Sequence, residues 1–305
     1  AENNIDVDPE NQVLVTAGTS EALDLAFRAI IDPKDEVLVP EPSYVSYKPC
    51  VWFSYGNPVG VPMREENEFR VSVEDLEENT TEKTRALIVA SPNNPTGSVL
   101  TKKDVEEIAD FSVEHDLTVV SDELYEDLVY DSLKHVSMAS LNGMSERVIT
   151  INGFSKGFAF TGWRLGYAAG PGDILEAMMK IHQYTMLCAP TIAQYAALEF
   201  ERTKKHVRQM VREYDRRRRL LVTGLNELEG VECVDPKGAF YAFPNISGTG
   251  LSSQDYARRL LEEAGVAVVP GDTFGPSGEG YVRCSYSVGR KEIAEALKRM
   301  KTFNP

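Results

Sequence analysis

Short apolar segments alternate with helix-like segments along the first part of this 305-residue chain. Residues 36–40, 85–90 and 117–122 are rich in Val, Ile and Leu, and Pro, Asn, Asp or Ser bounds each run. Such runs are typical of parallel strands that are buried on both faces. Between the last two runs, residues 101–115 have apolar positions at helical spacing after a capping Thr101. This alternation predicts an α/β fold with a mostly parallel sheet and crossover helices.

Further segments extend the same pattern. Residues 12–16 predict a strand that leads into an amphipathic helix at residues 20–30. Residues 147–153 and 164–170 predict two more strands that follow closely on one another.

The second part of the chain is organised differently. Residues 192–228 have helical periodicity without a breaker, which predicts a long connecting helix, straight or bent. The segments after it predict strands at 231–234, 239–244, 266–270 and 281–287 and helices at 252–265 and 291–300. This mixture is typical of an α+β unit. We therefore expect a large domain at residues 1–210 and a smaller C-terminal domain at residues 211–305.

The charge balance argues against some classes of partner. The chain has 47 acidic side chains against 32 Lys and Arg, a net charge of -15, which disfavours binding to nucleic acid or to an anionic membrane. The run Arg216–Arg219 stands beside Glu213 and Asp215, and its side chains point to all sides of one helical turn. We therefore expect the solvated face of a helix there rather than a nucleic-acid site.

Cysteine and histidine usage predicts neither disulfides nor a metal. The four cysteines form no CxxC pair, and the four histidines show no metal-ligand spacing. No apolar run approaches the roughly 20 residues needed to cross a bilayer. We therefore expect free thiols, no metal ion and no membrane contact in a cytoplasmic protein.

An isolated lysine follows the strand predicted at residues 147–153. Lys156 lies in the motif FSKGFAFTGWRLGY. We expect its amine to be desolvated by four aromatic residues of this stretch, Phe154, Phe158, Phe160 and Trp163. Desolvation lowers the proton affinity of an amine, so Lys156 would be available as a nucleophile. The alternative is a lysine that extends to the surface.

Polar residues follow other predicted strands, at the edge where α/β sheets bind ligands. Asp122 ends the strand at residues 117–122 and is a candidate buried carboxylate, with Tyr125 after it, although a helix cap would explain Asp122 equally well. Asn94 lies in the turn SPNNPTG, which propensity alone makes a loop. Arg164 is a lone guanidinium two residues after a glycine, suited to bind a phosphate through two hydrogen bonds.

Small residues join the strand at 12–16 to the helix at 20–30 in the motif TAGTSEAL. Free backbone N–H groups and the helix dipole favour a phosphate there. Only one glycine is present, so the GxGxxG dinucleotide fingerprint is not supported.

One ligand suits the whole set of candidate residues. Pyridoxal 5'-phosphate (PLP) has a phosphate, a ring nitrogen for a carboxylate, a ring oxygen for Asn94 and Tyr125, a ring face for Tyr44 and an aldehyde for a lysine.

Together these motifs resemble the class I/II aminotransferases of PLP fold type I, over residues 12–301. The resemblance implies a mostly parallel, seven-stranded sheet sandwiched by helices in the large domain and a smaller α+β C-terminal domain. It implies that Lys156 binds the cofactor covalently and that Asp122 and Tyr125 are catalytic as well. The cofactor-binding residues that it implies are Gly18, Thr19, Ser20, Tyr44, Asn94, Asp122, Tyr125, Ser155, Lys156 and Arg164. Asn94 and Arg283, the latter in GYVRCSYS, are implied to bind the substrate, with Arg283 on its α-carboxylate.

The resemblance also implies a function. It implies transfer of an amino group from an L-amino acid (aspartate, aromatic or other) to a 2-oxo acid such as 2-oxoglutarate, by a ping-pong mechanism. A PLP-dependent lyase of the same fold, or a PLP-binding regulatory domain, would use the same cofactor residues, so both remain alternatives. A homodimer is implied because the family builds its sites across two subunits. Tyr184, Met186 and Leu187 resemble a stretch near that interface, although core packing explains them equally well.

Two departures from the family pattern affect these expectations. The chain begins AENNIDVDPE without an initiator Met and lacks the family's N-terminal segment over the substrate, so we expect a truncated or partly recorded chain. Aspartate-using prokaryotic members often have lysine where Ser20 stands here. Serine at this position weakens the expectation of aspartate as the substrate.

Overall fold

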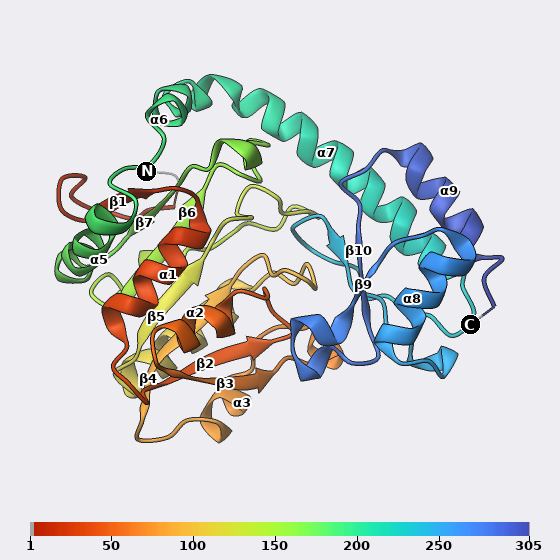
Figure 1. Ribbon diagram of the computed structural model, residues 1–305, viewed down its shortest axis with the longest axis horizontal. Coiled ribbons are helices and arrows are strands. Elements are labelled where there is room, and N and C mark those ends of the chain that lie inside the picture. The colour runs from red at the N-terminus through yellow and green to blue at the C-terminus, as the bar shows by residue number, and fades with distance from the viewer. Residues whose placement is uncertain (1–2, 305) are drawn as a thin grey trace.

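The computed structural model describes residues 3–304 and places seven strands of this range in one sheet (Figure 1). The strands are β1 (Val13–Thr16), β2 (Glu36–Glu41), β3 (Asn57–Pro62), β4 (Thr84–Ala90), β5 (Thr118–Asp122), β6 (Val148–Gly153) and β7 (Gly166–Ala169). Their order in the sheet is β1-β7-β6-β5-β4-β2-β3. β7 pairs antiparallel with β1 and β6, and the other pairings are parallel. The prediction of a mostly parallel α/β sheet is confirmed.

Helices cover the sheet. In the described range they are α1 (Thr19–Ile30), α2 (Tyr47–Phe53), α3 (Val73–Glu78), α4 (Lys102–Glu114) and α5 (Gly172–Thr185). In the chain, α1 to α4 each lie between two strands of the sheet, whereas α5 follows β7. Thr101 caps α4, since its hydroxyl accepts from the Asp104 N–H while the Asp104 carboxylate accepts from the Thr101 N–H. Within residues 3–304, no helix combines the length and the apolar character that a membrane crossing requires.

Successive residues of one strand pack into two different cores. Val37 and Val39 of β2 belong to the core that contains Phe27 of α1, whereas Leu38 belongs to the core that contains Ile108 of α4. Figure 1 shows α1 and α2 in front of the sheet. Strands that are buried on both faces are continuous apolar runs in the sequence, which is why β2, β4 and β5 are predictable.

Some segments of the large sheet and of the long helix differ from the sequence prediction. β3 was not predicted, because its two prolines and one glycine are unusual in a strand; it lies at the edge of the sheet, where such residues are tolerated. The long helix predicted at residues 192–228 is divided into α6 (Thr191–Ala197) and α7 (Phe200–Leu225). No glycine or proline marks the interruption at residues 198–199, so the sequence offers no signal for it.

A second, three-stranded antiparallel sheet follows α7 in the chain, in the order β8-β10-β9. Its strands and flanking helices are β8 (Tyr241–Ala242), β9 (Val269–Pro270), β10 (Val282–Ser285), α8 (Ser253–Ala264) and α9 (Arg290–Met300). The strand predicted at residues 231–234 is reduced to an isolated bridge between Glu232 and Asn245. The domain division at residues 210 and 211 stays a prediction, and α7 runs continuously across it (Figure 1).

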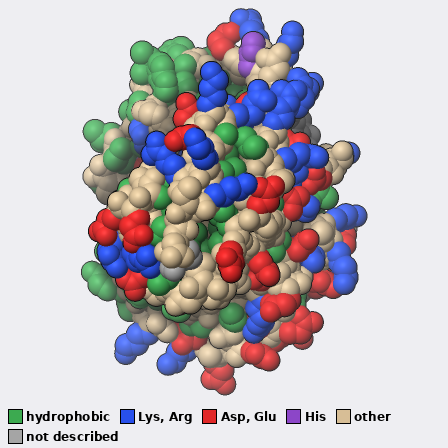
Figure 2. Space-filling model, turned by 90° about the vertical axis from the view of Figure 1, so that its right-hand side faces the viewer, with side chains coloured by type: hydrophobic (Ala, Val, Ile, Leu, Met, Phe, Trp, Pro, Cys, Tyr) green, Lys and Arg blue, Asp and Glu red, His purple; other side chains and the backbone are tan. Residues whose placement is uncertain are grey.

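Basic and acidic side chains are interspersed on the surface of this second part. Arg259 pairs with Glu263 on α8 at 2.7 Å, and Arg299 pairs with Glu295 on α9 at 2.9 Å. Figure 2 shows the face that carries these helices, with acidic and basic groups next to one another. Each pair spans one helical turn, so the charges are balanced locally.

One arginine of the run Arg216–Arg219 is buried, contrary to the expected solvated face. Arg218 is 1% exposed, and its guanidinium pairs with Asp131 and Asp215 at 2.8 and 2.7 Å. It also donates to the carbonyl oxygen of Pro236 at 2.7 Å and lies over the ring of Tyr130. The expectation failed for Arg218 because its partners at residues 131 and 236 are distant in the sequence. This arginine joins α7 to the loop after β5 and to the segment before β8.

We predict that Arg218→Ala lowers the free energy of unfolding by about 2–4 kcal/mol, because it removes a fully buried side chain together with its hydrogen bonds to Asp131 and to the Pro236 carbonyl. Urea unfolding followed by circular dichroism measures this loss. Arg216→Ala is the matched control: Arg216 is exposed and lies 3.6 Å from Glu213, so its loss should cost about 0.5 kcal/mol or less. Equal effects of the two substitutions would contradict the assignment of Arg218 as the buried member.

Candidate active site

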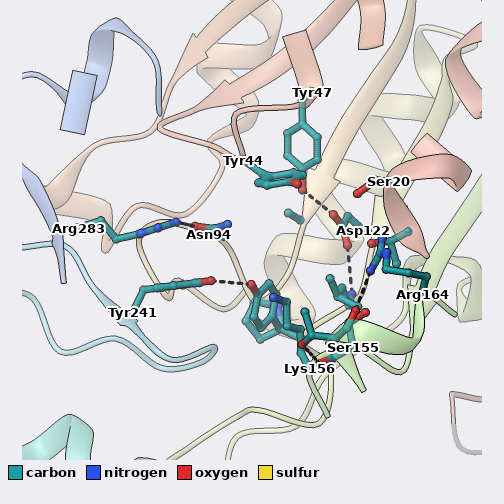
Figure 3. Close-up of a pocket in the computed structure, with 16 residues that line it drawn as sticks. Ser20, Tyr44, Tyr47, Asn94, Asp122, Ser155, Lys156, Arg164, Tyr241 and Arg283 are labelled. Carbon is teal, nitrogen blue, oxygen red and sulfur yellow. Dashed lines mark hydrogen bonds between the residues drawn. The ribbon is translucent and has the colours of Figure 1, made fainter. Parts of the chain in front are cut away.

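A cavity of about 410 Å³ lies at the carboxyl ends of β4, β5 and β6, where the two sheets face each other (Figure 3). Its lining residues come from strands of both sheets and from the helices and loops next to them: Thr19, Ser20, Tyr44, Tyr47, Ala90, Pro92, Asn94, Asp122, Leu124, Tyr125, Ser155, Lys156, Thr161, Arg164, Tyr241 and Arg283. Every residue predicted for the site lines this cavity except Gly18, which lies against Arg164. The structure therefore brings together side chains up to 264 positions apart, from Thr19 to Arg283.

Asp122 is the last residue of β5 and is buried. Its carboxylate accepts a hydrogen bond from the Tyr47 hydroxyl at 2.8 Å and another from the Leu124 N–H at 3.1 Å. Burial raises the pKa of this carboxyl above its usual range, and the Tyr47 hydrogen bond opposes that rise. Within residues 3–304, Asp122 has no Lys, Arg or His as an ion-pair partner.

Tyr47 is a site residue that sequence reasoning missed. It is the first residue of α2, and its ring packs edge-to-face on Tyr44 with the centroids 5.6 Å apart. Both tyrosines belong to the motif EPSYVSY, so their shared motif was the available signal. In Figure 3 the two rings lie on one side of Asp122.

Lys156 follows β6 and reaches into the cavity. Burial lowers the pKa of its amine, Arg164 and Arg283 lower it further, and Asp122 opposes the shift. Its Nζ lies 5.9 Å from the ring centroid of Tyr125 and 5.6 Å from that of Phe240.

The aromatic residues expected around Lys156 pack elsewhere. Phe154, Phe158 and Phe160 have their ring centroids 4.6–4.9 Å from that of Phe200, at the start of α7. Trp163 stacks on Phe160 and is 46% exposed. The rings recorded near the Lys156 Nζ are instead those of Tyr125 and Phe240, which lie outside its own motif. Sequence reasoning did not predict these two contacts, because proximity in sequence does not determine which rings face the amine.

Arg164 and the start of α1 lie together at one end of the cavity. Gly18 has a φ of +90°, and a Cβ there would lie 2.4 Å from Nη2 of Arg164, so glycine makes room for the guanidinium. Arg164 donates to the carbonyl oxygens of Ala17 and Thr161 at 3.3 and 3.1 Å. Figure 3 shows Ser20 and Ser155 at this same end. A helix N-terminus beside a guanidinium favours a bound anion.

The opposite end of the cavity is formed with residues of the small sheet. Arg283 of β10 donates to Oδ1 of Asn94 at 2.9 Å, and its guanidinium lies over the rings of Tyr241 and Phe274. The Tyr125 and Tyr241 hydroxyls are 3.0 Å apart. Tyr241 was not predicted for the site. Its motif AFYAFP predicts only a strand, and its function depends on how the two sheets meet.

One group of potential metal ligands lies outside the cavity lining. Glu123, Glu126 and His135 have ligand atoms within 4.8 Å of one another. The Glu123 carboxylate already accepts hydrogen bonds from the hydroxyls of Ser121 and Ser137 at 2.9 and 2.8 Å. Because these bonds satisfy Glu123, the group has a structural explanation, and we assign no metal to it.

The comparisons with known proteins agree on one family. The family model of aminotransferase class I and II matches residues 1–300. Aspartate aminotransferase of Pyrococcus abyssi is 54% identical over 98% of this chain and 78% of its own length. Aromatic-amino-acid aminotransferase 2 of Thermococcus litoralis is 53% identical over 98% of this chain and 77% of its own length.

Solved structures give the same result. The aromatic aminotransferase of Pyrococcus horikoshii has a TM-score of 0.97 and 52% identity, over 99% of this chain and 81% of that one. The aspartate aminotransferase of Thermus thermophilus with maleate has a TM-score of 0.94 and 41% identity, over 99% of this chain and 78% of that one. This chain belongs to the class I and II aminotransferases and is an aminotransferase.

Proposed function

We propose that this aminotransferase holds PLP in the cavity between the two sheets, attached covalently to Lys156. The observation that carries the proposal is a lysine with lowered pKa in the same cavity as the buried Asp122. Within the described residues no Lys, Arg or His forms an ion pair with Asp122, and Lys156 acts on its carboxylate only from a greater distance. A buried carboxylate is costly without a closer cation, and a protonated ring nitrogen would be that cation.

The other end of the cavity fits the phosphate of the same cofactor. Arg164, Ser20, Ser155 and the first turn of α1 would donate to it, beside the space that Gly18 leaves. Tyr125 and Asn94 would donate to the ring oxygen, and Tyr44 would stack on the ring. These roles stay proposals that rest on where the side chains lie.

In the proposed amino transfer, each residue of the cavity would have a separate role. PLP, when bound, supplies an electron sink for the negative charge that develops at the α-carbon of an amino acid. Asp122 would hold a proton at the ring nitrogen. The Lys156 Nζ, with its low proton affinity, would take the α-proton and later return it. Arg283, oriented by Asn94, would bind the α-carboxylate of the substrate.

We propose an L-amino acid donor and a 2-oxo acid acceptor such as 2-oxoglutarate, which would use the cavity in turn and thus follow ping-pong kinetics. Relatives named for aspartate and for aromatic amino acids are about equally similar to the chain.

A panel of amino acids, each assayed with 2-oxoglutarate by measuring the glutamate formed, tests the proposal. Parallel lines in double-reciprocal plots are expected. Release of ammonia without glutamate would indicate a lyase instead.

Replacing Lys156 by Ala should abolish turnover and covalent retention of PLP. Borohydride reduction followed by mass spectrometry of the intact chain detects the attached cofactor. Lys180→Ala is the control, because Lys180 lies on the exposed side of α5, paired with Glu176 at 2.9 Å. If the Lys156 variant kept both the activity and the attached cofactor, Lys156 would not be the attachment site.

Replacing Tyr47 by Phe should shift the acid limb of the pH profile of kcat/KM to higher pH, by about one unit. The Tyr47 hydroxyl donates to the charged form of Asp122 and so lowers its pKa. Without this bond the pKa of Asp122 rises, and the carboxylate is lost at a higher pH. Tyr55→Phe, at a 77% exposed tyrosine, should leave the profile unchanged. A shift to lower pH would rule out this role of Tyr47.

We propose that the protein is a homodimer that buries the surface formed by the end of α5, the loop after it and α6. Large apolar side chains are exposed there, and their exposed fractions are 86% for Tyr184, 80% for Leu187, 70% for Ile192, 71% for Tyr195 and 74% for Leu198. Such a patch is rarely left in contact with water. Core packing, the alternative for Tyr184, Met186 and Leu187, is wrong because all three are exposed, Met186 to 45%.

The double substitution Leu187→Asp and Tyr195→Asp should convert a dimer into a monomer, since each copy would place charges in an apolar interface. Sedimentation velocity at equal protein concentrations measures the change. Leu261→Asp, at a 54% exposed leucine of α8, is the control and should remain a dimer. A dimer that persists in the double variant would place the interface elsewhere.

A further inference from the structure

Two tyrosine hydroxyls from different sheets meet inside the cavity. Tyr125 follows β5 of the large sheet, and Tyr241 is the first residue of β8 in the small sheet. Their oxygens are 3.0 Å apart, and both residues are buried, with exposed fractions of 6% and 7%. The dashed line from Tyr241 in Figure 3 marks this bond. Each hydroxyl has one proton, so only one of the two can donate to the other.

The direction of this bond determines what Tyr125 can do. If Tyr125 donates to Tyr241, its only proton is used and it has none for the ring oxygen of the cofactor. If Tyr241 donates, the Tyr125 proton is free to point into the cavity, and the bond that it receives makes it a stronger donor. We propose that Tyr241 is a positioning residue that donates to Tyr125 and so directs the Tyr125 proton at the cofactor. This inference rests on the proposed PLP function.

Both hydroxyls keep their protons at neutral pH. The proposal requires this, because Tyr241 would donate to Tyr125 and Tyr125 to the cofactor. Burial raises the pKa of Tyr125 well above its ordinary value, and the neighbouring Tyr241 raises it further. Burial raises the pKa of Tyr241 as well. The charged or titratable groups that act on the pair are Arg283, Asp122, Lys156, Tyr44 and Tyr214.

The small sheet holds the Tyr241 hydroxyl in place. Tyr241 pairs with Ser285 of β10, the strand that carries Arg283. Its ring lies 4.5 Å from the Arg283 guanidinium carbon and packs on Phe240 with centroids 4.7 Å apart. The tyrosine that would orient the Tyr125 proton and the arginine that would bind substrate therefore lie on paired strands of one sheet.

Removing the Tyr241 hydroxyl tests the direction of the bond. A ring oxygen that accepts a strong hydrogen bond stays anionic more readily, and the linked nitrogen at Lys156 then holds its proton less tightly. In Tyr241→Phe the pH at which the absorbance of the bound cofactor changes should rise by about 0.3–1 unit, a 2- to 10-fold change in proton affinity. No shift, or a shift to lower pH, would overturn the proposal. The lower pH is expected if Tyr125 donates to Tyr241 instead.

A second variant tests the same point without removing the group. Incorporation of 3-fluorotyrosine at position 241 keeps the hydroxyl and makes it a stronger donor, so the absorbance change should move to lower pH. A shift to higher pH, or none, would contradict the proposal. Because this variant preserves the packing, it remains informative even if Tyr241→Phe fails to fold.

Two further variants serve as controls. Tyr286→Phe removes a buried hydroxyl near β10, which donates to the Ala239 carbonyl at 3.4 Å outside the cavity lining, and should leave the absorbance change where it is. In the double variant Tyr125→Phe and Tyr241→Phe, the shift should not exceed that of Tyr125→Phe alone, since Tyr241 acts through Tyr125. If the shift of the double variant equalled the sum of the two single shifts, the proposal that Tyr241 acts through Tyr125 would be contradicted.

The outcomes separate this inference from the function on which it rests. If the unmodified protein binds no PLP, the proposed function fails. If it binds PLP with a pH-dependent absorbance that Tyr241→Phe leaves unchanged, the function stands and only the role of Tyr241 is refuted.

Discussion

The buried carboxylate of Asp122 is the constraint on which the rest of the site depends. It is the last residue of β5 and is only 8% exposed, and it borders the cavity. Tyr47 and the Leu124 N–H supply hydrogen bonds, but neither supplies positive charge. A cationic ring would complete this environment, and the nearby Lys156 and Arg164 explain how such a ring could be held at its other positions.

The sequence predicts those features of the fold and of the site that are determined by residues close together in the chain. Strands buried on both faces are continuous apolar runs, and polar residues directly after them mark the ligand edge, which is how Asp122, Asn94 and Lys156 could be selected. The edge strand β3 and the interruption between α6 and α7 have no such local cause. Arg218 shows the same limit, because four adjacent arginines look alike until the fold brings Asp131 to one of them.

Tyr47 and Tyr241, two of the residues that sequence reasoning missed at the site, share one property: each forms a hydrogen bond with another side chain that lines the cavity. Tyr47 contacts Asp122, and Tyr241 contacts Tyr125 and Arg283. A residue that binds a ligand directly often stands in a recognisable motif, because the chemistry fixes its type. A supporting residue needs only to place a hydroxyl at the right distance. Its position is therefore set by packing between elements, which a single sequence does not reveal.

Charged side chains at both ends of the cavity act on Lys156. Arg164 and Arg283 both lower the pKa of this amine, and in the proposed function each binds an anion, the phosphate at one end and the substrate carboxylate at the other. An anion on Arg283 cancels part of its repulsion of a proton on Lys156. Substrate binding would therefore raise the proton affinity of the Lys156 Nζ at the stage at which Lys156 takes the α-proton. Thus the arginine that selects an α-carboxylate would also strengthen the base that acts beside it.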